Sequence, residues 1–187
     1  MNRDRKKIIR SWKMYDWANS AFATTIMAAV LPEYYSSVAG STLDKTTATS
    51  YWGYSNTVAM LIIAVAAPIL GAMGDQSGTK KRFLGGFAVV GILATALLIG
   101  VGHGMWFFAS LLYILGRIGF GGANIFYDSL LPHVARQGEI DRVSAEGYAY
   151  GYLGGGILLA INLLMILKPA FFRIPDAEWA SRISFLT

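Results

Sequence analysis

Residues 83–101 read FLGGFAVVGILATALLIGV and contain no charged side chain. As a helix this stretch rises about 28 Å, close to the roughly 30 Å thickness of a membrane's hydrocarbon core. Similar apolar stretches flank it, and together they predict five membrane-spanning helices, at residues 17–35, 52–73, 83–101, 105–127 and 145–167. Residues 180–187 turn apolar after a polar segment and are expected to begin a sixth helix. The sequence therefore predicts an all-α, multi-pass membrane protein with a single membrane domain over residues 1–187.

The composition supports this fold class. Hydrophobic residues make up 55% of the chain and charged residues only 14%, whereas soluble domains carry about 25% charged residues. The net charge of +5 arises mainly from basic residues in short loops beside apolar spans, which favours a role in membrane orientation over nucleic-acid binding. The chain has no cysteine, and neither His103 nor His133 has a second metal ligand at a useful spacing. We therefore expect no metal, no cofactor and no enzymatic site.

The basic residues also predict an orientation. With the N-terminus in the cytoplasm, the cytoplasmic segments hold eleven Lys and Arg residues and the opposite side holds four. The positive-inside rule then favours a cytoplasmic N-terminus. The apolar segment at 17–35 is longer than the roughly 7–15-residue core of a cleavable signal, so we expect it to remain as an anchor.

A polar segment between the second and third predicted spans, residues 71–82, reads GAMGDQSGTKKR. Its glycines permit a tight reversal with positive φ angles, and the Asp75 carboxylate is suited to a helix N-terminus or a cation. The basic triplet at 80–82 can pair with carboxylates or lipid phosphates. One interpretation is a glycine-rich turn with basic anchors. Its glycine and lysine spacing does not match a phosphate-binding P-loop.

The segment also resembles the signature loop of the major facilitator superfamily. The family pattern is Gly, three residues, Asp, a basic residue, any residue, Gly, any residue and two basic residues. This chain departs from the pattern at Gln76, where the family has a basic residue. In that family the loop latches the cytoplasmic side in one state of alternating access. The resemblance implies a gating role for Gly71, Asp75, Gly78, Lys80, Lys81 and Arg82.

Three further runs extend the resemblance: YDWANSAFA at 15–23, NIFYDSLLPHVA at 124–135 and SAEGYAYGYLGGG at 144–156. They are similar to the vacuole-effluxer, autophagy-related branch of the superfamily and its bacterial relatives. Members are twelve-helix transporters, and fungal members are implicated in releasing amino acids from the vacuole. The resemblance implies that residues 1–187 form an incomplete N-terminal six-helix bundle whose C-terminal half is missing.

The function implied is a secondary active transporter that moves a small solute by alternating access, with amino-acid efflux as the suggested activity. Its expected partners are the lipid bilayer, the solute and the missing half; ion coupling and uniport both remain open. The cell membrane is the expected location rather than a vacuolar one. The alternative from a different class is a non-transporting multi-pass scaffold or assembly subunit.

Arg117 lies near the midpoint of the fourth predicted span. An arginine at that depth costs roughly 2.5–3.5 kcal/mol or more unless it is paired or faces water. Arg117 could bind a substrate carboxylate or hold a coupling acid, or it could bridge to backbone carbonyls of a neighbouring helix. Asp128 lies about 16 Å further along the same helix, so it cannot be the partner there. Arg117 followed four residues later by Gly121 also resembles the superfamily's second signature.

The first predicted span carries polar residues at Asp16, Asn19, Ser20 and Thr24. Spacings of three, four and eight residues predict a shared helix face, which should turn away from lipid. Asp16 could line a cavity or cap the helix, and we expect the cap. Asn19 and Thr24 are expected to line a cavity.

The fifth predicted span contains a stripe of small residues at spacings of four. Such stripes let helix backbones approach closely, so we expect a packing role for Gly147, Gly151 and Gly155, as for Gly121. Glu146 precedes the stripe. It could accept a salt bridge from the basic loop and take part in gating, or it could simply be solvated at the membrane interface.

Overall fold

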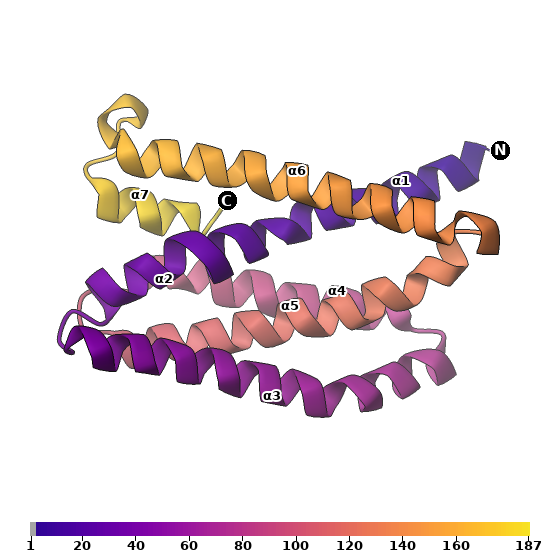
Figure 1. Cartoon of the computed structure of the whole chain (residues 1–187), viewed down its shortest axis with the longest axis horizontal. Helices are drawn as coiled ribbons and strands as arrows, with labels where there is room; N and C mark the ends of the chain where they lie inside the picture. Colours follow the sequence, from indigo (N-terminus) through magenta and orange to yellow (C-terminus); the bar gives the residue numbers. More distant parts are fainter. Residues whose placement is uncertain (1–2) are drawn as a thin grey trace.

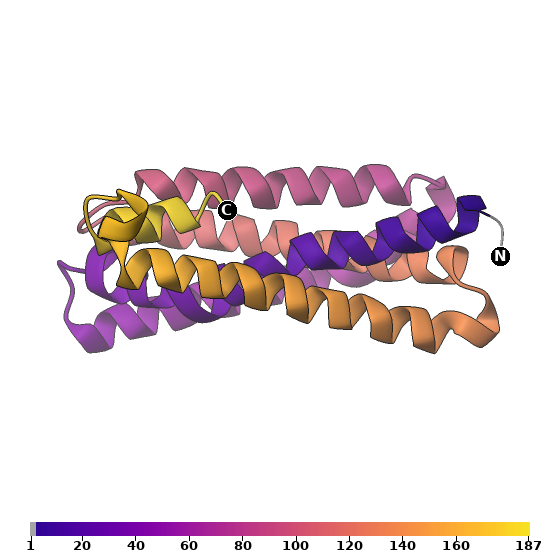
Figure 2. The ribbon, with the colours of Figure 1, turned by 90° about the horizontal axis from the view of Figure 1, so that it is seen from above.

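The computed structural model describes residues 3–187, apart from the side chains of residues 75–77. Its helices run along one common axis and form an elongated bundle (Figure 1), which is also seen from above in Figure 2. Within the described residues there is no β-strand. The prediction of an all-α membrane fold is confirmed.

The first predicted span is helical but divided. α1 (Arg3–Ala21) continues into the π-helix η1 (Phe22–Ala29), the short α2 (Val30–Tyr34) and the π-helical η2 (Tyr35–Ala39). The remaining helices are α3 (Lys45–Ser77), α4 (Lys80–Leu97), α5 (Trp106–Val134), α6 (Ile140–Leu167) and α7 (Ala177–Ser184), with 3-10 turns at Leu98–Gly100, Gln137–Glu139 and Pro169–Phe172.

Four helices within the described residues are long and apolar enough to cross a membrane, at 45–74, 80–100, 106–134 and 137–167. They correspond to the second to fifth predicted spans. Large apolar side chains are exposed along them, such as Val65 of α3 at 71% and Ile92 of α4 at 65%. A bundle with so much apolar surface needs lipid as its solvent.

Several helices extend beyond the predicted spans: α3 begins at Lys45 and α6 at Ile140, both before the predicted starts. α1 already begins at Arg3, so the basic N-terminal segment is helical and continuous with the first span. α5 continues to Val134, so residues 128–134 are helical and not part of a loop. The hydropathy pattern locates only the part of a helix that lies in hydrocarbon, and a helix can continue past that boundary until a turn ends it.

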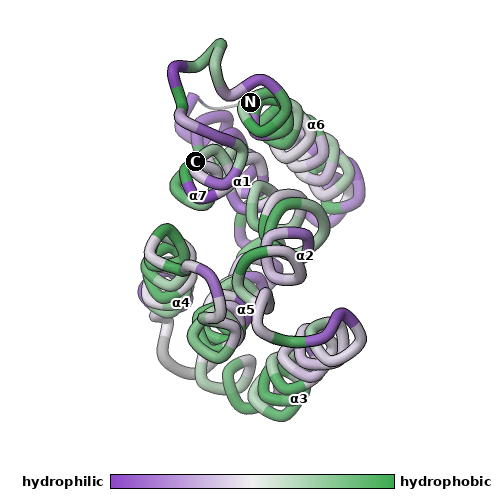
Figure 3. The backbone as a smooth tube through the Cα atoms, turned by 90° about the vertical axis from the view of Figure 1, so that its left-hand side faces the viewer, coloured by the Kyte–Doolittle hydropathy of each residue, from purple (hydrophilic) through white to green (hydrophobic). Residues whose placement is uncertain are grey.

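Glycines determine how closely the helices pack. α5 packs against both α3 and α4, and α1 packs against α6 (Figure 3). A Cβ atom added to Gly119 of α5 would lie 2.6 Å from Cα of Gly91 on α4. A Cβ added to Gly154 of α6 would lie 2.5 Å from the carbonyl oxygen of Trp17 on α1. At both crossings the backbones approach too closely for a larger residue.

The segments rich in Lys and Arg lie at one end of the bundle, because successive spans run in opposite directions. The N-terminus, the turn at 78–79 and the connection at 135–139 lie at this end, which we term the basic end (Figure 1). The connections at 40–44, 101–105 and 168–176 lie at the opposite end.

Candidate functional site

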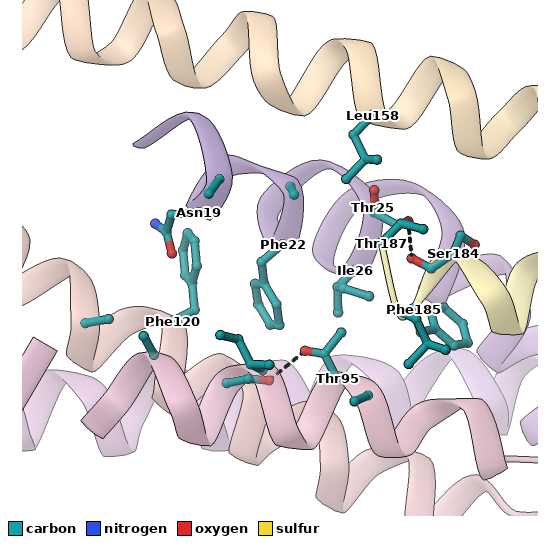
Figure 4. A pocket seen from close by; sticks show the side chains of 18 of the residues that line it. Asn19, Phe22, Thr25, Ile26, Thr95, Phe120, Leu158, Ser184, Phe185 and Thr187 are labelled. Carbon is teal, nitrogen blue, oxygen red and sulfur yellow. Dashed lines mark hydrogen bonds between the residues drawn. The ribbon is translucent and has the colours of Figure 1, made fainter. Parts of the chain in front are cut away.

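One side of α1 borders a cavity of about 300 Å³ (Figure 4). Its walls are mainly apolar, with the rings of Phe22 and Phe120 and the side chain of Ile26 pointing inward. The described lining residues include no charged side chain; the polar ones are Tyr15, Asn19, Thr25, Thr95, Ser184 and Thr187. This cavity therefore has no charge with which to hold a carboxylate or a cation.

One face of α5 carries polar residues. Arg117, Gly121, Asn124 and Asp128 recur at spacings of four, seven and eleven residues, so they share one helix face. Phe120, three residues after Arg117 and four before Asn124, borders this face and lines the cavity. On this face of α5, Arg117 and Asn124 both contact the first span, while Gly121 faces α3. We term the polar residues between the first span and α5 the polar seam: Asp16, Asn19, Arg117, Asn124 and Asp128.

Arg117 is held in the seam by a thioether. Its Nη1 atom donates to Sδ of Met27 in η1 at 2.8 Å, and its Nε atom is buried with no partner among the described residues. Tyr113, one turn away, donates instead to Oδ1 of Asn56 on α3 at 3.0 Å. Among the described residues, Arg117 forms no ion pair with a carboxylate and no hydrogen bond with a backbone carbonyl. The guanidinium therefore retains donors for an added anion.

Asn19 is the seam residue that also reaches the cavity. Its Nδ2 atom donates to Oδ1 of Asn124 at 2.7 Å, and its side chain contributes to the cavity wall. Thr24 lies elsewhere, because its hydroxyl donates to the carbonyl of Gly155 on α6 at 3.1 Å. The predicted common face therefore divides: Ser20 and Thr24 turn toward α6, whereas Asn19, about 100° from Ser20 around the helix, turns toward α5.

Asp16 does not cap a helix. It lies in the interior of α1, thirteen positions after the first helical residue, so the prediction of a cap is wrong. The basic segment before Asp16 is itself helical, which leaves no free backbone N–H groups there to cap. Asp16 is only 9% exposed, and a Cβ atom on Gly151 of α6 would lie 2.6 Å from its Oδ2 atom.

The segment at 71–82 reverses at a single residue. Gly78 ends α3 with φ 61°, whereas Gly71 and Gly74 are helical, so the prediction of positive φ angles at several glycines is wrong. Gly74 instead lies against the ring of Phe126, which would be 2.8 Å from an added Cβ. The Asp75 side chain lies outside the described residues.

The basic residues of this segment are at the basic end. Lys80 donates from Nζ to the carbonyl of Ser129 on α5 at 3.3 Å, so it ties the start of α4 to α5. Lys81 and Arg82 are exposed. These contacts place the segment beside the end of α5.

Ion pairs join α1 to the start of α6. Lys13 binds the carboxylate of Glu146, and Arg5 binds that of Glu139. The partner of Glu146 thus lies on α1 and not in the segment at 71–82. Each glycine of the α6 stripe faces α1: Gly147 meets Trp12, Gly151 meets Asp16, and Gly155 meets Thr24.

Sequence reasoning missed Asn124, Tyr127 and Asn162. Asn124 and Asp128 could have been identified, because they continue the helix face of Arg117. Asn162 of α6 is fully buried; it donates to Oγ1 of Thr25 at 3.3 Å and accepts from Oγ1 of Thr187 at 3.1 Å. Nothing in the sequence around Asn162 indicates those partners, which lie far away along the chain.

Comparisons with known proteins agree with this architecture. The chain matches the family model "Vacuole effluxer Atg22 like" over residues 42–141. It is 38% identical over 177 residues to the "Uncharacterized MFS-type transporter YxiO" of Bacillus subtilis (strain 168), which is 94% of this chain and 41% of that protein. It is 30% identical over 137 residues to "Autophagy-related protein 22" of Pichia angusta, covering 63% of this chain and 24% of that protein.

The chain thus spans less than half the length of these two relatives. No solved structure gives a significant match. The resemblance noted in the sequence is confirmed by the family model, which covers more than half of the chain. The chain belongs to the vacuole effluxer Atg22-like family.

Proposed function

We propose that the chain is part of a secondary active transporter that exports a small carboxylate-bearing solute of the amino-acid class by alternating access. The observation that carries the proposal is Arg117, a cation within a membrane-length helix whose described neighbours include no carboxylate partner. Intramembrane arginines usually mark a substrate or ion pathway. The description of the matching family and the name of the Bacillus subtilis relative also support a transporter.

A carboxylate is the group that best fits the guanidinium of Arg117. Arginine binds carboxylates through two parallel N–H···O bonds, and such charge-assisted bonds contribute about 1.5–3 kcal/mol each. The thioether of Met27 is a weak acceptor, so an incoming carboxylate would displace it at little cost. The apolar part of an amino acid would then lie among the neighbouring apolar side chains.

The gate belongs to the same proposal. We place the basic end in the cytoplasm of a cell, with the turn at Gly78 connecting two helices that move relative to the missing half. Asp75, Lys80, Lys81 and Arg82 would latch that half in one state, and Gly71 would allow α3 to pack closely against it. The exposed positions of Lys81 and Arg82 are compatible with such a contact.

The test is amino-acid exchange by the full-length protein in proteoliposomes. Arg117→Ala should lower exchange of a radiolabelled amino-acid mixture about tenfold or more, since one charge-assisted bond exceeds 1.4 kcal/mol. Arg117→Lys should retain part of the activity. Arg136→Ala, an exposed arginine at the basic end, is the matched control and should leave exchange unchanged.

A second arm tests the carboxylate itself. Decarboxylated amines of the same side chains should not be exchanged by the wild type. Equal exchange of amines and amino acids, or full activity of Arg117→Ala, would remove the proposed role of Arg117. A wild type that exchanges no solute and co-purifies with a fixed partner would favour the scaffold alternative.

A further inference from the structure

Asp16 is a buried acid without a counter-charge. It is 9% exposed, and its carboxylate forms no hydrogen bond or ion pair with the described part of the chain. The nearest cation along α1 is Lys13, whose ammonium is bound to Glu146. A charged carboxylate buried without a partner is strongly unfavourable, and a bound proton removes that penalty.

Tyr127 of α5 provides an unused hydroxyl beside this acid. The residue is 5% exposed, and its OH group has no partner within the described residues. Its ring is fixed by stacking on Trp12 at 4.3 Å and on Tyr15 at 5.0 Å between centroids. The OH would lie 3.3 Å from a Cβ on Gly147, one helical turn from Gly151, which faces Asp16. The phenol is therefore directed into the junction of α1, α5 and α6 that contains the acid.

The other ionisable groups around the junction do not neutralise Asp16. Asp128 on α5 interacts with it electrostatically and carries the same charge. Tyr15 on α1 and Tyr148 on α6 are the further titratable groups near Tyr127. Arg117 lies eleven residues from Asp128, about 16 Å along α5. Like charge from Asp128 and the absence of a described cation both favour the protonated acid.

We infer that Asp16 binds a proton in the junction of α1, α5 and α6, beside the hydroxyl of Tyr127, which is unpartnered among the described residues, and that this proton is the coupling ion. Asp16 takes the proton from water as a carboxylate, holds it as a carboxylic acid and returns it to water, with no other bond made or broken. Gly151 leaves the space in which the acid is accommodated. The proton site stands on the structure alone, whereas its coupling to solute rests on the proposed function.

The site is tested without any solute, by infrared difference spectroscopy of the purified full-length protein during an acid titration. The wild type should show a carboxylic-acid carbonyl band that is absent in Asp16→Asn. Asp141→Asn, an exposed aspartate at the start of α6, is the matched control and should retain the band. An unchanged band in Asp16→Asn would overturn the assignment.

Two further variants test the residues beside Asp16. They should shift the pH at which the band appears in opposite directions. Tyr127→Phe removes the hydroxyl that could donate to the ionised carboxylate, so the band should appear at a higher pH than in the wild type. Asp128→Asn removes a like charge, so the band should appear at a lower pH. If neither midpoint moves, the titrating acid does not lie in this junction.

The bound cation is identified by comparing sodium chloride with choline chloride at constant pH. A proton site leaves the band equal in the two salts. Loss of the band in sodium alone would show that Asp16 binds sodium, which would overturn the inference.

Coupling is tested in proteoliposomes with the same amino-acid mixture. Asp16→Asn should retain exchange without a gradient but lose accumulation driven by an imposed pH gradient, while Asp141→Asn retains both. Gradient-driven accumulation by Asp16→Asn at the wild-type level would overturn the coupling role. A wild type without any exchange would contradict the proposed function, and the infrared titration would still decide the proton site.

Discussion

Asn19 of α1 donates a hydrogen bond to Asn124 of α5 at 2.7 Å and so joins the first span to the helix that carries Arg117. Side-chain hydrogen bonds between membrane helices contribute about 0.6–2 kcal/mol. A double-mutant cycle of Asn19→Ala and Asn124→Ala should give a coupling energy of about 0.5–1.5 kcal/mol, measured by unfolding in mixed micelles.

The control for that cycle is Asn19→Ala with Asn56→Ala. Asn56 accepts from Tyr113 and forms no hydrogen bond with Asn19, so these two changes should be additive. Equal coupling in the two cycles would show that the Asn19–Asn124 bond makes no specific contribution.

The crossing of α4 and α5 predicts a size limit at Gly119. Gly119→Ala should lower the free energy of unfolding by about 1–3 kcal/mol, because its Cβ would overlap Gly91. Gly86→Ala is the matched control on α4: no atom lies within 4 Å of its added Cβ, and alanine favours a helix over glycine by up to about 1 kcal/mol. Thermal unfolding in detergent measures both, and equal stability of the variants would contradict the close crossing.

The absence of cysteine from the chain allows a direct test of orientation. Lys81→Cys and Lys45→Cys place single thiols at exposed positions, at the basic end and the opposite end respectively. A membrane-impermeant maleimide should label Lys45→Cys in intact cells, and Lys81→Cys only after permeabilisation. The reverse pattern would invert the topology and the proposed latch with it.

Asp44 predicts a pH dependence at the start of α3. Its carboxylate accepts from the side chain of Thr47 at 2.5 Å and from the backbone N–H of Thr47 at 3.0 Å, and these bonds hold the pKa of Asp44 below its ordinary value. A lowered folded-state pKa gives stabilisation that is complete above the unfolded pKa and is lost as the pH falls through the folded one. The hydrogen-exchange protection factor of the Thr47 amide should therefore fall on acidification.

Asp44→Asn distinguishes the effect of the Asp44 charge from the effect of its hydrogen bond at the start of α3. Asparagine still caps the helix but does not titrate, so protection of Thr47 should persist at low pH, whereas Asp44→Ala should lose it even at neutral pH. Parallel loss of protection in the wild type and Asp44→Asn would show that another group titrates.

The sequence predicted the positions of four spans because their apolar composition is dictated by lipid, but the helices extend further, as at Lys45 and Val134. It could not give the true helix ends at Arg3 and Val134, since polar residues outside the hydrocarbon form helix as readily as loop. The first predicted span is helical but is not among the helices that, within the described residues, are long and apolar enough to cross a membrane. Its π-helical segments at 22–29 and 35–39 have no signal in hydropathy.

For the site, the sequence indicated Arg117 and Asn19 because polar residues within apolar spans are conspicuous. The contact of Arg117 with Met27 could not be predicted, since methionine within a span gives no sign of a polar neighbour. The division of the first span's polar residues depends on which helices pack on each side, and helical spacing alone does not contain that information.

The π-helix η1 separates two contacts of the first span with α5, that of Asn19 with Asn124 and that of Met27 with Arg117. In a π-helix each N–H bonds one residue further back than in an α-helix, so rewinding one such turn rotates the chain beyond it by about 100°. Asn19 lies before η1 and Met27 lies within it. A rewinding of η1 would therefore turn the part of the first span that carries Met27 relative to the part that carries Asp16 and Asn19.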